Sequence, residues 1–179
     1  MKTSSLHSFN KVYAFFILLF SIVACNDFNY ESIKGNGDVV TKSKFLASDF
    51  DALSIAGSYN ITIVPSKRDS IIITAESNII PYVLVERRGD LLIIKNAPNT
   101  NLRTTEPIKI TLFPANISDI DLSGSGSIIA DSINSADIKL SIAGSGSILA
   151  GLVAKNLDIS IAGSGDVIVN GNATNTVII

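Results

Sequence analysis

The sequence predicts an all-β chain folded as a β-solenoid, in which coils of about 20 residues stack in parallel. Glycine-serine-glycine triplets begin at Gly124, Gly144 and Gly163, at a nearly constant spacing. Aliphatic and polar residues alternate before each triplet, as a strand with one buried face requires. The region 117–179 contains no proline, the residue that cannot donate to a strand ladder.

Residues 1–24 are predicted to be a lipoprotein signal peptide. Lys2 and Lys11 flank the polar start, and residues 12–23 form an apolar run that is too short to span a bilayer. The run ends in Ile-Val-Ala-Cys, which resembles a bacterial lipobox whose cysteine, Cys25, becomes the lipidated first mature residue. The alternative is an ordinary signal peptide with an unrelated cysteine.

Cleavage before Cys25 would leave a mildly acidic chain of limited chemistry. It would hold 12 Lys and Arg against 16 Asp and Glu, a net charge of −4, without a basic patch for nucleic acid. The single histidine, His7, would leave with the signal, and Cys25 would be the only cysteine. Histidine-dependent catalysis, His/Cys metal sites and disulfides are therefore excluded, and no cofactor is expected.

Residues 25–34 are predicted to be a polar tether, and residues 35–179 a single β-solenoid domain. Weaker versions of the triplet begin at Gly35, Gly57 and Arg87, so that we align six turns in all. In the clear repeats, the aligned apolar positions are Ile120, Leu140 and Ile159, followed by Leu122, Ile142 and Ile161. Stacked on one another, these positions would form the aliphatic core.

The triplets are interpreted first as corners and only second as a binding loop. Glycine adopts positive φ without a steric penalty, and small residues let stacked corners approach one another. The predicted structural turn residues are Gly124, Gly126, Gly144, Gly146, Gly163 and Gly165.

The chain resembles the putative auto-transporter adhesin, head GIN domain family. The resemblance rests on GNGDVV at 35–40, FDALSIAGSYNITI at 50–63, the segment from Ile80 through VERRGDLLI, and the repeated LSIAGSGSI and ISIAGSGDV units. It covers about residues 34–179 and implies a secreted or surface-anchored, right-handed parallel β-helix of the kind common in Bacteroidetes. It supplies no catalytic residues.

Family members usually continue with further units, whereas this sequence stops at Ile179. We therefore expect a domain truncated at its C-terminus, or a fragment. Either would leave an apolar strand from Asn175 to Ile179 with open backbone groups, and self-association through that edge is a predicted consequence.

The remaining polar residues offer few candidate sites. Asp119 and Asp121 could form a glycosidase pair, but Lys139 aligns between Asp119 and Asp158, which favours an alternating-charge column. The adjacent arginines at 87–88 could bind an anionic glycan, although a solvated corner is the simpler interpretation. Nucleotide loops and calcium rolls do not fit, because the third glycine, the lysine and the nine-residue period are missing.

Together these observations predict a non-enzymatic lipoprotein of the cell envelope that acts as an adhesion or scaffold module. Its expected partners are the outer membrane, through lipid on Cys25 and on either its periplasmic or surface face, and a surface glycan or an envelope protein. The alternative is a carbohydrate-active enzyme of the β-helix type. A cluster of carboxylates in a cleft would indicate that enzyme.

Overall fold

The computed structural model describes residues 30–46, 50–67 and 69–179. The predicted signal peptide and Cys25 lie outside the described residues. The chain divides into two compact units, Met1–Tyr30 and Glu31–Ile179, and every described strand belongs to the second.

The second unit is all-β, as the sequence predicts. In the part of the chain that the structure describes, no helix is long and apolar enough to cross a membrane. One short 3-10 helix, η1 (Ile80–Tyr82), interrupts the strands. The strands are β1 (Glu31–Lys34), β2 (Val39–Phe45), β3 (Ala52–Ala56), β4 (Asn60–Ile63), β5 (Ser70–Glu76), β6 (Val83–Arg88), β7 (Leu91–Asn96), β8 (Thr100–Arg103), β9 (Lys109–Phe113), β10 (Asp119–Gly124), β11 (Ser127–Gly144), β12 (Ser147–Gly163) and β13 (Asp166–Ile178).

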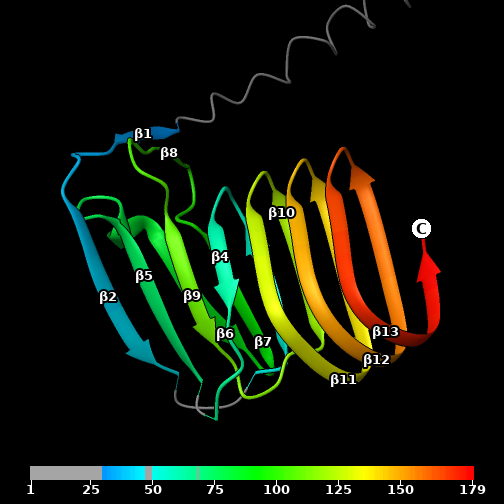
Figure 1. Cartoon of the computed structure of the whole chain (residues 1–179). Coiled ribbons are helices and arrows are strands. Elements are labelled where there is room, and N and C mark those ends of the chain that lie inside the picture. The colour runs from blue at the N-terminus through cyan, green and yellow to red at the C-terminus, as the bar shows by residue number, and fades with distance from the viewer. Residues whose placement is uncertain (1–29, 47–49, 68) are drawn as a thin grey trace, which may run out of the picture. The chain divides into compact units, whose positions relative to one another are not determined.

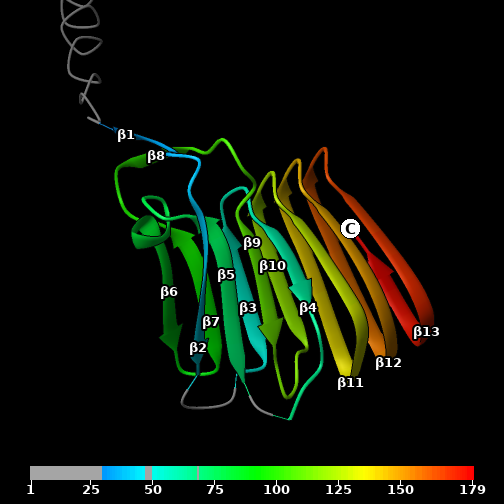
Figure 2. The ribbon, with the colours of Figure 1, turned by 60° about the vertical axis from the view of Figure 1, so that its left-hand side comes forward.

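Eleven of these strands form one curled sheet, and β1 and β8 form a separate parallel pair. The order in the large sheet is β2-β5-β9-β4-β11-β10-β3-β7-β6, and β12 and β13 extend it from β11. Figures 1 and 2 show why β11 stands in the middle of this order: it runs along one side of the molecule, bends, and returns along the other.

The curled sheet therefore makes two walls that face each other across the core (Figure 2). The β4 wall contains β2, β5, β9, β4 and the first arms of β11, β12 and β13, at residues 127–130, 147–150 and 166–169. The β10 wall contains β6, β7, β3, β10 and the second arms of the same three long strands.

The predicted aliphatic columns lie in the core between the walls. Ile120, Leu140 and Ile159 are neighbours in the sheet and are each at most 5 % exposed. In the second column Leu122 and Ile142 are buried, and Ile161 packs against them partly buried. Because these side chains come from successive strands, each strand buries its apolar face only by stacking on the next.

The strands β10 to β13 pair in parallel, in the register that alignment on the glycine triplets predicts. The turn that begins at Gly57 joins them, because β3 and β4 pair in parallel with β10 and β11. Yet Ala52 lies beside Asp119, although six further strands, β4 to β9, come between them in the sequence. Of these, β5, β6, β7 and β9 fold onto the other side of this coil, and β8 pairs with β1, so they do not add two coils of the expected length.

The solenoid prediction is wrong for this N-terminal part. The turn at Arg87 is a two-residue hairpin, in which Arg88 faces Leu91 across the antiparallel pair β6–β7. Gly89 has φ +62°, which the first central position of such a hairpin favours. The turn at Gly35 leads into β2, which pairs antiparallel with β5. Neither turn is a corner of a parallel coil, so four of the six aligned turns are corners.

The start of the paired structure also differs from the expected boundary. Residues 31–34 belong to the predicted tether, but they form β1 and pair with β8 from Glu31–Thr100 to Lys34–Arg103. This short strand is stable here because its partner comes from a distant part of the sequence, which local composition does not reveal.

Candidate binding groove and the corners that shape it

The structure places the six predicted turn glycines at the corners between the two walls. The first glycine of each triplet has positive φ and lies against the corner before it. A Cβ on Gly124 would lie 2.6 Å from the Gly57 carbonyl oxygen, and one on Gly144 would lie 2.4 Å from that of Gly124. On Gly163 it would lie 2.3 Å from the Gly144 oxygen. Any larger residue would separate the rungs.

The second glycine of each triplet, at Gly126, Gly146 and Gly165, serves the same close approach without positive φ. The corners are also joined by backbone hydrogen bonds. The Ser145 N–H donates to the Gly124 oxygen at 3.0 Å, and the Ser164 N–H donates to the Gly144 oxygen at 2.9 Å. Glycine-serine-glycine thus lets successive corners stack closely on one another.

The opposite bend of the long strands contains two glycines that the sequence analysis missed. A Cβ on Gly151 would lie 2.4 Å from the Asp131 oxygen, and one on Gly171 would lie 1.8 Å from the Leu152 oxygen. A lone glycine in the interior of a strand marks a close backbone approach, and this signal is present at both positions.

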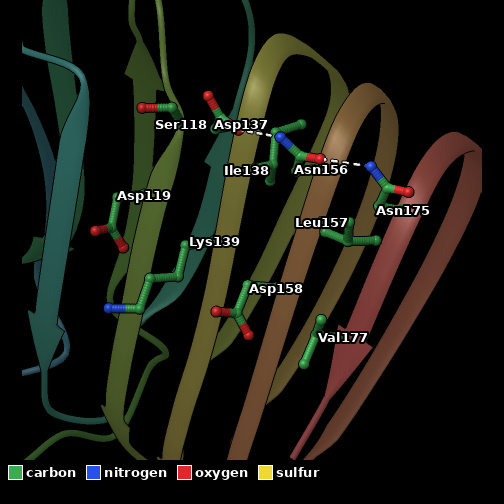
Figure 3. A pocket seen from close by; sticks show the side chains of 10 residues that line it. All are labelled: Ser118, Asp119, Asp137, Ile138, Lys139, Asn156, Leu157, Asp158, Asn175 and Val177. Atoms are coloured by element: carbon green, nitrogen blue, oxygen red, sulfur yellow. Dashed lines mark hydrogen bonds between the residues drawn. The ribbon is translucent and has the colours of Figure 1, made fainter.

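A groove of about 550 Å³ runs across the outside of the β10 wall, from β10 to β13. Figure 3 shows that the groove's side chains come from neighbouring strands and that the polar ones lie in two rows across these strands, with Ile138 and Leu157 between the rows. The lining residues are Ser118, Asp119, Asp137, Ile138, Lys139, Asn156, Leu157, Asp158, Asn175 and Val177.

The first row is the predicted alternating-charge column. Asp119, Lys139 and Asp158 are direct neighbours in the sheet, as the alignment predicts. Lys139 nevertheless does not come within 4.0 Å of either carboxylate; the ion pairs of the described residues all involve Glu86 or Asp90. Its side chain leans towards Asp119 in Figure 3. The column is therefore present, but its lysine is left available to a third group.

Asp119 is the electrostatically unusual member of this row. Burial raises the pKa of its carboxyl above the ordinary value, and the negative charges of Asp121 and Asp51 add to the rise. The positive charge of Lys139 opposes them. The Asp119 Oδ1 atom is buried and has no hydrogen-bond partner in the structure. This oxygen would gain from a donor, because an unpaired buried acceptor is costly.

The second row is an amide ladder. The Asn175 side-chain amide donates to the Asn156 oxygen at 2.8 Å, and the Asn156 amide donates to an Asp137 oxygen at 2.6 Å. The dashed lines in Figure 3 mark both bonds. Each amide is thereby held in one orientation, with its remaining donor and acceptor capacity available to a ligand.

The arginines at the β6–β7 hairpin are already engaged with acids of the same hairpin. Arg87 lies 3.8 Å from Asp90, and Arg88 lies 3.4 Å from Glu86, which also accepts from Lys95 at 3.0 Å. Lys95 and Arg88 accordingly hold the pKa of Glu86 below its ordinary value. The structure favours the interpretation of this pair as a charged corner over an anion site.

Two buried carboxylates, Glu76 and Asp69, were also missed, and both accept hydrogen bonds from backbone N–H groups. Glu76 accepts from the Gly37 N–H at 2.7 Å and from the Thr105 N–H and hydroxyl at 3.0 and 2.7 Å. Asp69 accepts from the N–H groups of Phe50 and Ala115 at 3.0 and 2.6 Å. An acid at or directly beside the end of a buried strand is the only signal that could have indicated them.

The groove can therefore hydrogen-bond a polar ligand along two rows of groups at the spacing of the strands. Among the described residues, no three His, Cys, Asp or Glu side chains are arranged to hold a metal ion. The polar groups in the groove are fixed amides, carboxylates and one ammonium, and they lie beside the apolar side chains of Ile138, Leu157 and Val177. The polar groups are suited to binding hydroxyl- and amide-rich molecules, and the apolar side chains add a surface for the carbon face of such a ligand.

Solved structures show the same fold. A protein described as a putative lipid binding protein, from Parabacteroides distasonis, matches with a TM-score of 0.76 and 25 % identity. The match covers 83 % of this chain and 65 % of that one, so this chain spans slightly less than two thirds of its relative's length. A putative adhesin from the same organism matches with a TM-score of 0.60 and 18 % identity, over 80 % and 70 % of the two chains.

No curated protein matches the chain. The descriptions of these relatives name an adhesin and a lipid binding protein and no enzyme, and an adhesin-like family suggests a protein of the cell surface or envelope. The family model for the putative auto-transporter adhesin, head GIN domain matches residues 49–179, and the chain belongs to that family, as its repeated motifs indicate.

Proposed function

We propose that this protein is a non-enzymatic adhesion module of the cell envelope, and that the groove on the β10 wall binds an extended surface glycan. The observation that carries the proposal is the amide ladder, in which Asp137, Asn156 and Asn175 present hydrogen-bonding groups from three successive strands. A ligand made of repeating units can meet such a row at several points, whereas a small substrate needs a closed pocket.

The groove's charge pattern supports a binding role more than a catalytic one. Asp119 has a raised pKa, as a general acid would, but Lys139 lies beside it in the sheet, and its charge opposes that rise. At the positions that align with Asp121, the next two strands, β11 and β12, carry serines, Ser141 and Ser160. A carbohydrate-active enzyme would need a second carboxyl as base or nucleophile. The other carboxyls of the groove are Asp137, which accepts a hydrogen bond from the Asn156 amide, and Asp158, which Lys139 separates from Asp119 in the sheet.

The experiment is a glycan array probed with the purified chain and two asparagine variants. Asn156→Ala breaks both bonds of the ladder and should weaken binding at least tenfold. Asn60→Ala is the matched control, because Asn60 is also exposed and also accepts a side-chain hydrogen bond, from Ser127, but on the β4 wall.

Three outcomes would contradict the proposal. Wild-type protein could retain no glycan, Asn156→Ala could bind as well as wild type, or Asn60→Ala could lose binding equally. New reducing ends in a bound polysaccharide would contradict the non-enzymatic part alone, and would favour the carbohydrate-active enzyme instead.

The proposal extends to the setting in which the module works. Lipid on Cys25 would tether it to the outer membrane, and the residues between Cys25 and β1 would separate it from the bilayer. In this proposal the stacked strands β10 to β13 belong to a right-handed β-helix, the fold that the family motifs imply, with rungs of about 20 residues. A glycan in solution or on a neighbouring cell could then reach the groove from the side of the stack.

A further inference from the structure

The two walls leave a second hollow at the end of the molecule that carries β2 and β6. These strands stand first and last in the order of the large sheet, and in the described structure they pair with β5 and β7 but not with each other. Figure 2 shows both at the same end of the molecule, away from β13. The cleft between them has a volume of about 410 Å³ and shares no lining residue with the groove on the β10 wall.

The floor of this cleft is aliphatic. Its side chains come from β5, η1 and β6, and they are Ile71, Ile73, Ile80, Val83 and Val85. The first four are only 2 % to 9 % exposed, and Val85 is partly exposed. A single hydrocarbon chain that enters between the walls can contact this floor. The flat surface of a bilayer cannot, because the walls keep it away from side chains that are this deeply buried.

Two lysines of β2 supply charge at the same cleft. Lys42 lies opposite Ile73 and Lys44 opposite Ile71 in the antiparallel pair, and opposite residues share a face of the sheet. Both lysines therefore lie on the face that carries the core, although they are exposed. Neither forms an ion pair with a described residue, and no described Asp or Glu lines the cleft. The charge at the cleft is therefore positive.

Edge protection explains only part of this arrangement. Inward-facing charges on an edge strand oppose pairing with another chain, and a lysine stem can lie over aliphatic side chains while its ammonium stays in water. Both effects account for lysines at positions 42 and 44. They do not account for an unfilled volume above an aliphatic floor, because protein cores are packed with few voids larger than a water molecule.

We propose that this cleft binds a single-chain anionic amphiphile, in the simplest case a free fatty acid. The acyl chain lies on the aliphatic floor between the walls, and its carboxylate lies at the ammonium groups of Lys42 and Lys44. The cleft is near the lower end of the range of about 300–1,000 Å³ that small-molecule sites span, which favours one acyl chain over a two-chain lipid. This site is independent of the glycan groove and of its proposed role.

A displacement assay tests the role of the lysines. The probe is a dansyl-labelled undecanoic acid added to the purified full chain, and the competitors are dodecanoate and dodecanol, all below the concentrations at which they aggregate. We expect saturable binding of the probe, and about tenfold tighter binding of dodecanoate than of dodecanol, because only the acid carries a charge. Lys42→Gln combined with Lys44→Gln should remove this preference and leave the affinity for dodecanol unchanged.

Two further variants separate charge from shape. Lys109→Gln with Lys155→Gln is the matched control, because it removes the same charge from exposed positions on β9 and β12 that do not line the cleft. This control should keep the preference for the acid. Val85→Phe enlarges a partly exposed side chain of the floor, so it should weaken binding of dodecanoate and dodecanol alike. Thermal melts of each variant show whether it is folded.

A wild-type chain without saturable probe binding would overturn the proposal, as would a variant of Lys42 and Lys44 that prefers the acid as strongly as the control does. Sedimentation with phosphatidylglycerol vesicles, in the absence of dodecanoate binding, would assign the lysines to a membrane surface and would also overturn it. If Val85→Phe fails to fold, the lysine variant decides alone, because both lysines are exposed and their replacement leaves the core intact.

Discussion

Among single residues, Glu76 shows how one carboxylate can hold three segments of this chain together. Its oxygens accept from Gly37 in the segment before β2 and from Thr105 in the segment after β8, while its own backbone ends β5. Gly35 is required for this packing, because a Cβ there would lie 2.0 Å from a Glu76 oxygen. These bonds, with the Thr105 hydroxyl first, hold the pKa of Glu76 below its ordinary value.

The lowered pKa of Glu76 predicts a pH dependence. A carboxyl whose pKa is lower in the folded state contributes stability that is fully present above its unfolded pKa of about 4.3 and is lost as the pH falls through the folded value. Glu76→Gln should therefore melt at a lower temperature than wild type at pH 7, and the difference should shrink below about pH 4. Thermal melts across this range measure it. A difference that is constant with pH would show that shape, not charge, matters here.

The core columns make a second prediction at this scale. Ile142 is 2 % exposed between the walls, whereas Ser141 beside it faces outward and is partly exposed. Ile142→Ala should lower the free energy of unfolding by about 2–5 kcal/mol, as large-to-small core changes do. Ser141→Ala should change it by less than about 0.5 kcal/mol. Urea denaturation of both variants compares them, and equal effects would contradict the assigned faces.

Residue patterns could predict the aliphatic columns of the core but not the role of the Glu76 carboxylate. The alternation at Leu140 and Ile142 is repeated three times at fixed spacing, so chance agreement is small. Glu76 has no such repetition, and its partners lie 39 and 29 residues away in segments without regular structure. Long-range contacts of a single polar residue leave no periodic trace in a sequence. Of the two polar rows in the groove, only the row of Asp119, Lys139 and Asp158 could be predicted, because these three residues align on the repeat.

At the scale of elements, the corners predict that two glycines with positive φ respond differently to alanine. Gly144 has φ +136°, and its Cβ would overlap the corner before it, so Gly144→Ala should cost about 3 kcal/mol or more. Gly89 has φ +62° and open space around it, so Gly89→Ala should cost only the backbone term of about 1–2 kcal/mol. Equilibrium unfolding of the two variants distinguishes close approach from backbone strain.

The hairpin that contains Gly89 also explains where element prediction failed. Gly89–Asp90 fits both a repeat corner and a two-residue hairpin, and alignment on the repeat selects the wrong one. Parallel and antiparallel pairing place the same aliphatic residues on the same face. The alternation in β2, β5 and β9 therefore predicts strands correctly but carries no information on their direction or partners.

At the scale of the whole molecule, the attachment to a membrane depends on Cys25 in our proposal. Cys25→Ala should abolish fatty-acid labelling and release the protein from the membrane fraction, because a protein without its acyl chain loses that anchor. Metabolic labelling and fractionation of cells that express either chain measure both effects. The control is Asp27→Ala, which leaves the predicted lipobox intact and should stay labelled. Unchanged membrane association of the Cys25→Ala chain would contradict the lipoprotein prediction.

The pairing of β3 with β10 has a kinetic consequence. Pairing Ala52 with Asp119 closes a long connection, so the chain loses much conformational entropy before the contact contributes any stabilisation. Each later strand pairs with the strand before it across a single short coil, which costs less entropy. A chain emerging from the ribosome or translocon must wait until residue 124 is available before this seam can close. From that moment every further coil has a finished template, so refolding should show one slow seam-forming step, insensitive to changes in β13.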